Sequence, residues 1–231
     1  MVMVYYAKVF PFLEEGTFFA HKEQIEERRW QEITGKKNRE AGIRSLTAGV
    51  LLHRGLCAYF NCPPESTPPF QTGCGQWGKP YLADYPGVYF NLSHSGEYVC
   101  CVVADCEVGV DVQKHQNIKA GLAERFFTKE DQMLLESLTE KEREERVFRI
   151  WSIRESYVKF TGRGIGQGLD SFAIDWQNMA LLDSDKEPLA YFEENHELEG
   201  YSMCVCAPER ERNPDWVRIE LWEGNSGERN A

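Results

Sequence analysis

Four short segments carry the side chains of this sequence that are best suited to phosphate chemistry. In chain order they are residues 77–81, 91–95, 109–111 and 151–159. The first two supply a lysine on a glycine-proline turn, two serines and a histidine, whose N–H and O–H groups suit phosphate oxygens. The last two supply an aspartate, a glutamate and a second lysine, and carboxylates are ligands that Mg²⁺ prefers. These residue types indicate metal-assisted chemistry at a phosphate.

The first two segments also have plain structural explanations. Residues 78–80 have the composition of a turn with an exposed lysine. Residues 93–95 follow a predicted strand and precede a glycine, so the serines could bond to their own backbone. Because neighbouring residues of a strand point to opposite faces, Ser93 and His94 are not expected to form a catalytic serine–histidine pair.

The acidic segments likewise admit structural explanations. Asp111 faces opposite to its two valine neighbours on a predicted strand and could lie on a solvated face. Glu155 and Lys159 have the spacing of a surface ion pair, which stabilises a helix by about 0.2–0.5 kcal/mol. Trp151 lies one turn earlier on the same helical face, which indicates that this face is not simply solvated.

The elements that must position these segments come in two successive sets. Asn38 is a predicted cap for a long helix to about residue 59, and capping boxes begin helices at Thr128 and Thr139, the latter ending at Gly162. Further helices are expected at 22–32 and 119–126, and strands at 2–10, 88–92, 98–104, 107–112, 172–176, 190–192, 201–206 and 217–221. Each set contains a strand, a long helix and then several strands, so we expect the α+β class.

Composition excludes several kinds of protein. The 231 residues are 42% hydrophobic and carry a net charge of −11, which argues against a general nucleic-acid binder. No apolar run approaches the roughly 20 residues of a membrane-spanning helix, and the N-terminus lacks the features of a signal peptide. Eight cysteines without a CxxC pair are typical of reduced thiols in a cytoplasmic protein. We therefore expect a cytoplasmic protein that binds neither nucleic acid nor membrane.

Taken together, the four segments resemble the signature of the 4′-phosphopantetheinyl transferases of the larger, surfactin-synthetase-activating (Sfp) type. That signature has a Gly-x-Asp strand followed about forty residues later by Trp-(Ser/Cys/Thr)-x-Lys-Glu-(Ala/Ser)-x-x-Lys, and here Asp111 and Glu155 lie 44 residues apart. The similarity extends from about Arg28 to about Ala207. It implies a pseudo-dimer of two similar α/β halves, residues 1–106 and 107–231, with coenzyme A and a metal ion in the groove between them.

The resemblance also implies a reaction and a set of roles. The enzyme would transfer 4′-phosphopantetheine from coenzyme A to a serine of an apo acyl or peptidyl carrier protein, releasing adenosine 3′,5′-bisphosphate. Mg²⁺ would be the metal, and Mn²⁺ should substitute. The catalytic residues would be Asp111, Glu155 (also the base for the serine proton) and Lys159. The coenzyme A ligands would be Arg44, Lys79, Pro80, Ser93, His94 and Lys159, with help from Lys36, Lys37 or Arg39. The metal ligands would be Asp111, Glu155 and Gln113.

Two positions depart from the family pattern. Arg154 replaces the lysine that usually precedes the glutamate, which keeps the charge but not the geometry. Gln113 replaces a glutamate that serves as a third metal ligand in the best-known members. Its amide oxygen could still ligate, or a water could take its place. We therefore expect weaker metal binding rather than lost activity.

The sequence also bears on how a carrier protein would dock and on which other functions remain open. Carrier proteins and this chain are both acidic, so docking should depend on a local apolar patch around 126–127 and 133–134, unless these residues belong to the core. We expect a monomer. The rival functions are a non-catalytic module that binds coenzyme A or a carrier protein, which Gln113 keeps open, and a metal-dependent phosphohydrolase.

Overall fold

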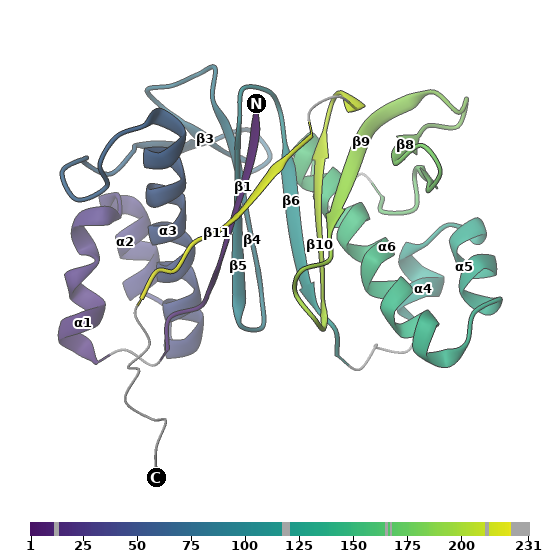
Figure 1. Ribbon diagram of the computed structural model, residues 1–231, viewed down its shortest axis with the longest axis horizontal. Helices are drawn as coiled ribbons and strands as arrows, with labels where there is room; N and C mark the ends of the chain where they lie inside the picture. Colours follow the sequence, from purple (N-terminus) through teal and green to yellow (C-terminus); the bar gives the residue numbers. More distant parts are fainter. Residues whose placement is uncertain (12–13, 117–120, 165, 167, 211–212, 223–231) are drawn as a thin grey trace, which may run out of the picture.

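Two β-sheets stand side by side at the centre of the molecule, and helices cover their outer sides (Figure 1). The computed structural model describes the chain except residues 12–13, 117–120, 165, 167, 211–212 and 223–231. Within the described residues, no helix is long and apolar enough to cross a membrane.

The first sheet has the strand order β11-β1-β5-β4. Its strands are β1 (Val2–Lys8), β4 (Tyr89–Ser95), β5 (Tyr98–Ala104) and β11 (Asp215–Arg218). Before β4 come α1 (Glu15–Ala20), a 3₁₀ turn (Lys22–Gln24), α2 (Glu27–Thr34), α3 (Arg39–Phe60) and the small β2 (Thr72–Cys74) and β3 (Pro80–Leu82) hairpin. The Asn38 side chain accepts a hydrogen bond from the Ala41 N–H, so the predicted cap of α3 is confirmed.

The second sheet has the strand order β6-β10-β9-β8-β7. Its strands are β6 (Gly109–Lys114), β7 (Ala173–Asp175), β8 (Ala180–Leu182), β9 (Pro188–Asn195) and β10 (Tyr201–Ala207), and its helices are α4 (Leu122–Phe126), α5 (Lys129–Glu136) and α6 (Glu140–Thr161). The capping boxes at Thr128 and Thr139 are both present, and Gly162 ends α6 in the left-handed conformation. Residues 119–120 of the predicted helix 119–126 lie outside the described residues.

The two sets of elements follow one plan. Within the part of the chain that the structure describes, each set has a strand, then three α-helices, then four strands. The first and last strands of each set pair antiparallel, β1 with β5 and β6 with β10, and the strand before the last lies on the other side, β4 and β9. The α+β class and the two similar halves expected from the sequence are therefore confirmed.

Apolar layers hold the halves together. Alternate residues of a strand point to opposite faces, so each sheet has one face for its long helix and one for the other sheet. α3 packs on the outer face of the first sheet, and α6 packs on the second. Between the sheets lies a shared cluster made largely of alternate residues of four strands: Val2, Val4, Tyr6, Cys100, Val102, Ala104, Val110, Val112, Met203 and Val205.

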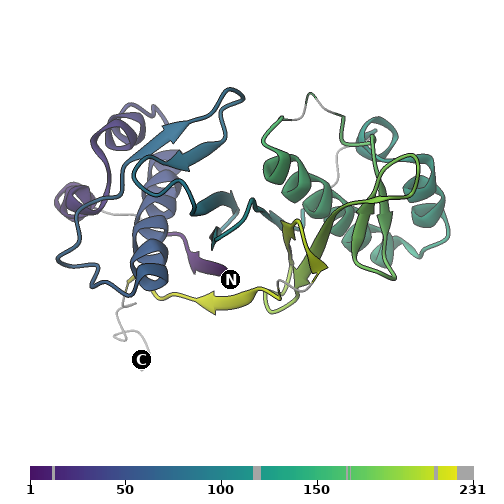
Figure 2. The same cartoon turned by 90° about the horizontal axis from the view of Figure 1, so that it is seen from above.

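The last strand returns to the first sheet. β11 pairs parallel with β1, from Met3 opposite Asp215 to Tyr6 opposite Arg218. Figure 2 shows this yellow strand crossing from the second set of elements to the side of α3. The chain therefore links the two sets twice, once between β5 and β6 and once between β10 and β11.

Some expectations need correction. The helix expected at 22–32 is divided into the 3₁₀ turn Lys22–Gln24 and α2 (Glu27–Thr34), because Ile25 between them has an extended backbone. β8 (Ala180–Leu182) was not predicted; it has three residues and directly follows Met179, which has a positive φ. The strand expected at 217–221 lies at Asp215–Arg218. Phe127 is buried in a cluster with Leu135, Val147 and Ile150, so it belongs to the core rather than to a docking patch, whereas Met133 is 69% exposed.

Candidate active site

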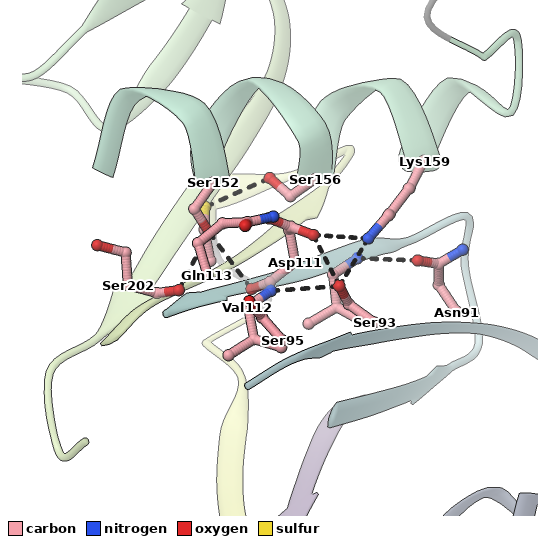
Figure 3. Close-up of polar contacts among 12 residues, drawn as sticks. Asn91, Ser93, Ser95, Asp111, Val112, Gln113, Ser152, Ser156, Lys159 and Ser202 are labelled. Carbon is pink, nitrogen blue, oxygen red and sulfur yellow. Dashed lines mark hydrogen bonds and ion pairs between the residues drawn. The ribbon is translucent and has the colours of Figure 1, made fainter. Parts of the chain in front are cut away.

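The candidate site lies where β4 of the first sheet runs beside β6 of the second. Side chains on one face of β4 accept hydrogen bonds from backbone N–H groups of β6: Val110 to Asn91 Oδ1 at 3.3 Å, Val112 to Ser93 Oγ at 3.4 Å and Lys114 to Ser95 Oγ at 3.0 Å. Figure 3 shows Asn91, Ser93, Ser95 and Val112 beneath α6. The predicted phosphate-binding serine, Ser93, is therefore buried between the halves.

Asp111 is the centre of this arrangement. It lies on β6, and its side chain is only 2% exposed. Its Oδ1 accepts hydrogen bonds from Ser93 Oγ at 2.7 Å and from Lys159 Nζ at 2.6 Å, and its Oδ2 accepts one from Gln113 Nε2 at 2.8 Å. The alternative of a solvated Asp111 is therefore wrong. The burial of Asp111 is balanced by a cation and neutral donors, as a buried carboxylate requires.

α6 brings Lys159 and Glu155 to the same place. Lys159 Nζ bonds to Ser93 Oγ at 2.8 Å as well as to Asp111, so it is not part of an ordinary surface pair with Glu155. Burial raises the pKa of Glu155 above its ordinary value, the negative charge of Asp111 raises it further, and Lys159 lowers it. Glu155 lies one helical turn before Lys159 on α6, and Lys159 bonds to Asp111. That the two carboxylates share one metal ion stays a prediction.

Close packing of α6 on β6 makes this possible. A Cβ atom added to Gly109 would overlap the Ser156 carbonyl oxygen and the backbone nitrogen of Phe160. Ser152 also donates a hydrogen bond from its Oγ to the Asp111 carbonyl oxygen at 3.3 Å. The glycine of the Gly-Val-Asp segment therefore lets the helix approach the strand that carries the carboxylate.

The opposite face of β4 carries His94. Partial desolvation lowers the pKa of its imidazole below the ordinary value, and the positive charges of Arg44, Lys159 and Lys36 lower it further. Arg44 is on α3, where its guanidinium lies 3.9 Å from Glu40. Arg44 and Lys36 of the first half and Lys159 of the second half thus place positive charge around His94, although the whole chain is acidic. Such a region is suited to an anionic ligand.

Lys79 follows the predicted glycine turn, where Gly78 has a φ of 83°. Its Nζ lies 2.5 Å from Glu107 Oε2, 3.2 Å from the Val108 carbonyl oxygen and 2.7 Å from the Phe160 carbonyl oxygen. Lys79 thus connects the β2–β3 hairpin to the start of β6 and the end of α6. Pro80 begins β3 opposite Cys74.

The acidic residues and Gln113 form a donor set that fits a small divalent cation. Among the described residues, no group of three or more histidine, cysteine, aspartate or glutamate side chains is arranged to hold a metal. The set consists instead of two carboxylates and one amide, all with hard oxygen donors of the kind Mg²⁺ takes. In this structure Gln113 presents its nitrogen to Asp111. Rotation of this amide would turn its oxygen toward the same place.

Arg154 does not face the site. Its guanidinium is completely buried and pairs with Asp131, and it also donates to the carbonyl oxygens of Leu169 and Phe172. The residue that replaces the family's lysine therefore joins α6 to α5 and to the segment before β7. This arrangement supports the helix that carries Glu155 and Lys159.

We expect Glu155 to titrate above its ordinary value in the metal-free protein and Asp111→Asn to bring this pKa down, because the substitution removes a nearby negative charge. Side-chain carboxyl chemical shifts measured by NMR against pH check both. Glu142, on the same helix, is an internal control, since its pKa is lowered by Thr139 rather than by the site. A Glu155 pKa that does not respond to Asp111→Asn would show that the carboxylates do not interact.

Sequence reasoning missed the role of Asn91 and Ser95. The signal was present, because Asn91, Ser93 and Ser95 alternate and must share one face of a strand. Residues 93–95 were interpreted as a single group of hydrogen-bond donors to phosphate oxygens. The structure divides it between the face toward β6 and the face that carries His94.

Comparisons with known proteins agree with this arrangement. The model of the 4′-phosphopantetheinyl transferase superfamily matches residues 107–206. The chain is 34% identical over 174 residues to 4′-phosphopantetheinyl transferase Sfp of Bacillus subtilis (strain 168), and 36% identical over 175 residues to 4′-phosphopantetheinyl transferase ffp of Bacillus subtilis; each match covers 74% of this chain and 76% of the other. It is 28% identical over 210 residues to 4′-phosphopantetheinyl transferase gsp of Aneurinibacillus migulanus, which covers 90% of this chain and 86% of that one.

Proposed function

The chain belongs to the 4′-phosphopantetheinyl transferase superfamily, and we propose that it transfers 4′-phosphopantetheine from coenzyme A to a serine of an apo acyl or peptidyl carrier protein. The curated relatives are named as transferases, which agrees with the enzyme class expected from the sequence. The observation that carries the proposal is the ion pair between Lys159 of α6, one helical turn after Glu155, and the buried Asp111 of β6.

In the proposed reaction, the serine hydroxyl attacks the β-phosphate of coenzyme A, and adenosine 3′,5′-bisphosphate leaves. Catalysis of such a transfer depends on positioning the groups and on neutralising charge. Glu155 accepts the serine proton, directly or through a water molecule. Lys159, held in place by Ser93 and Asp111, stabilises charge on the leaving phosphate.

Mg²⁺ is the proposed metal, held by Asp111, Glu155 and the amide oxygen of Gln113, and Mn²⁺ would substitute. When bound, it supplies Lewis-acid polarisation of the phosphate. The fit rests on the hard oxygen donors of these three residues and on the buried position of Asp111.

Coenzyme A is proposed to bind between the halves, with its phosphates on cations of the first half and on Lys159 of the second. Arg44 and His94 would contact the 3′-phosphate. Lys36 would help, since its positive charge also acts on the His94 imidazole and lowers its pKa. Lys159 would contact the diphosphate, and Ser93 would have to turn its hydroxyl from Asp111 to a phosphate oxygen to do so. Lys79 would have to exchange its contact with Glu107 for a phosphate oxygen.

The test is mass spectrometry of several apo carrier proteins after incubation with this enzyme, coenzyme A and Mg²⁺. We expect one phosphopantetheine to be added to at least one carrier. Binding of coenzyme A without a mass change would support the non-catalytic module instead. Release of phosphate or nucleotide with no carrier present would support the phosphohydrolase.

We expect Gln113→Glu to tighten Mg²⁺ binding by about tenfold, because a third carboxylate replaces a neutral amide that now donates to Asp111. Calorimetric titration of Mg²⁺ into the protein saturated with coenzyme A measures this change. Gln31→Glu is the matched control, since Gln31 also donates to a carboxylate, Glu27, but on the exposed surface of α2. Equal effects of the two substitutions would show that Gln113 acts only through net charge.

The remaining expectations are also proposals. A cytoplasmic location is supported by the eight free cysteines, five of which are buried. We propose that the enzyme acts as a monomer, which sedimentation measurements would test.

A further inference from the structure

β4 and β6 are joined by side chains rather than by a backbone ladder. They belong to different sheets. Each contact links a β4 side chain to a β6 amide nineteen positions later: Asn91 to Val110, Ser93 to Val112 and Ser95 to Lys114. The constant offset means that the two strands run parallel. Alternate side chains of β4 accept the hydrogen bonds that the carbonyl groups of a neighbouring strand would otherwise accept.

These contacts satisfy one edge of β6. The other edge pairs with β10, from Gly109 opposite Cys206 to Lys114 opposite Tyr201. A buried backbone N–H without a partner costs about 1–3 kcal/mol. Only one register of β6 relative to β4 therefore lets all three β6 amides donate to the side-chain oxygens of Asn91, Ser93 and Ser95.

The three β4 residues differ in how they reach the site. Ser93 touches Asp111 and Lys159 directly. Among the described residues, Asn91 and Ser95 contact the site through the β6 backbone, on either side of Asp111 and Gln113. They thus control where the carboxylate of the second half lies relative to β4, whose other face carries His94.

We propose that Asn91 and Ser95 are positioning residues, which hold β6 in register with β4 and so place Asp111 against the phosphate-binding cations of the first half. This inference rests on the proposed function, because it assigns the pair to the metal and coenzyme A site. The two halves are then aligned for catalysis by side-chain oxygens.

Ser95→Ala tests this proposal. We expect faster hydrogen exchange of the Lys114 amide, which loses its acceptor, and Mg²⁺ affinity about tenfold weaker in the protein saturated with coenzyme A. Ser95→Thr keeps the hydroxyl and should restore both. Should Ser95→Ala fail to fold, Asn91→Leu and Asn91→Asp form the equivalent pair, read at the Val110 amide.

Thr47→Val is the matched control. Thr47 lies on α3, and its buried Oγ1 accepts a hydrogen bond from the Phe10 N–H at 3.1 Å, so loss of this hydroxyl removes the same kind of bond. We expect it to lower stability without changing Mg²⁺ affinity. If Ser95→Ala behaves as Thr47→Val does, with unchanged Mg²⁺ affinity, the positioning role is wrong. A wild-type protein that binds no Mg²⁺ would refute the proposed metal site, and this inference with it.

Discussion

Replacing Asp111 with asparagine is expected to slow transfer to the carrier protein by on the order of 10²–10³-fold, the usual loss when one charge-stabilising group is removed. The substitution keeps the shape of the side chain but removes its negative charge. Lys159 then loses its ion-pair partner, and the proposed cation loses a carboxylate that is almost completely buried. Initial rates measured by carrier mass at saturating coenzyme A give the effect.

The matched control is Asp175→Asn. Asp175 accepts hydrogen bonds from Gln177 and Asn178 in an exposed turn of the second half, so it should not affect the rate. A circular dichroism melt shows whether each variant is folded. Turnover of Asp111→Asn close to that of the wild type would remove the central residue from the proposed mechanism.

Asp131→Ala is expected to destabilise the protein by about 3–5 kcal/mol, the usual cost of breaking a buried ion pair. Asp131 is 4% exposed and is the anionic partner of Arg154, whose guanidinium has no contact with solvent. Removing the carboxylate leaves a buried cation with carbonyl oxygens alone. Equilibrium unfolding in urea measures the change in the free energy of unfolding.

Asp131 also belongs to the capping box of α5, so the two contributions must be separated. Thr128→Ala removes the side chain that accepts from the Asp131 N–H, and such a cap contributes about 0.5–2 kcal/mol. We expect Asp131→Ala to cost clearly more than Thr128→Ala. Equal losses would mean that the Arg154 pair adds nothing to stability.

Local signals in the sequence predicted the elements well. The cap at Asn38 and the boxes at Thr128 and Thr139 act within one helical turn, so nearby residues are enough to identify them. The common face of Asp111 and Gln113 follows from strand alternation and is confirmed by their hydrogen bond.

Other features depend on contacts that are distant in sequence. Lys79 has the turn that was predicted, but its partners, Glu107 and the Phe160 carbonyl, come from two other segments. Phe127 could not be assigned to core or surface, because its burial depends on the packing of α4 and α5 against α6. Arg154 matched a family position by charge, yet its buried partner Asp131 is 23 residues earlier.

The return of β11 to the first sheet has a practical consequence for anyone who dissects this enzyme. A fragment that begins at residue 107 and runs to the C-terminus would contain a strand whose partner, β1, has been cut away. A fragment that ends at Ala207 keeps the entire second sheet, but the remaining N-terminal piece then exposes the edge of β1 to self-association. Separate expression of the two halves therefore calls for a rearranged gene, with the β11 segment fused to the piece that contains β1.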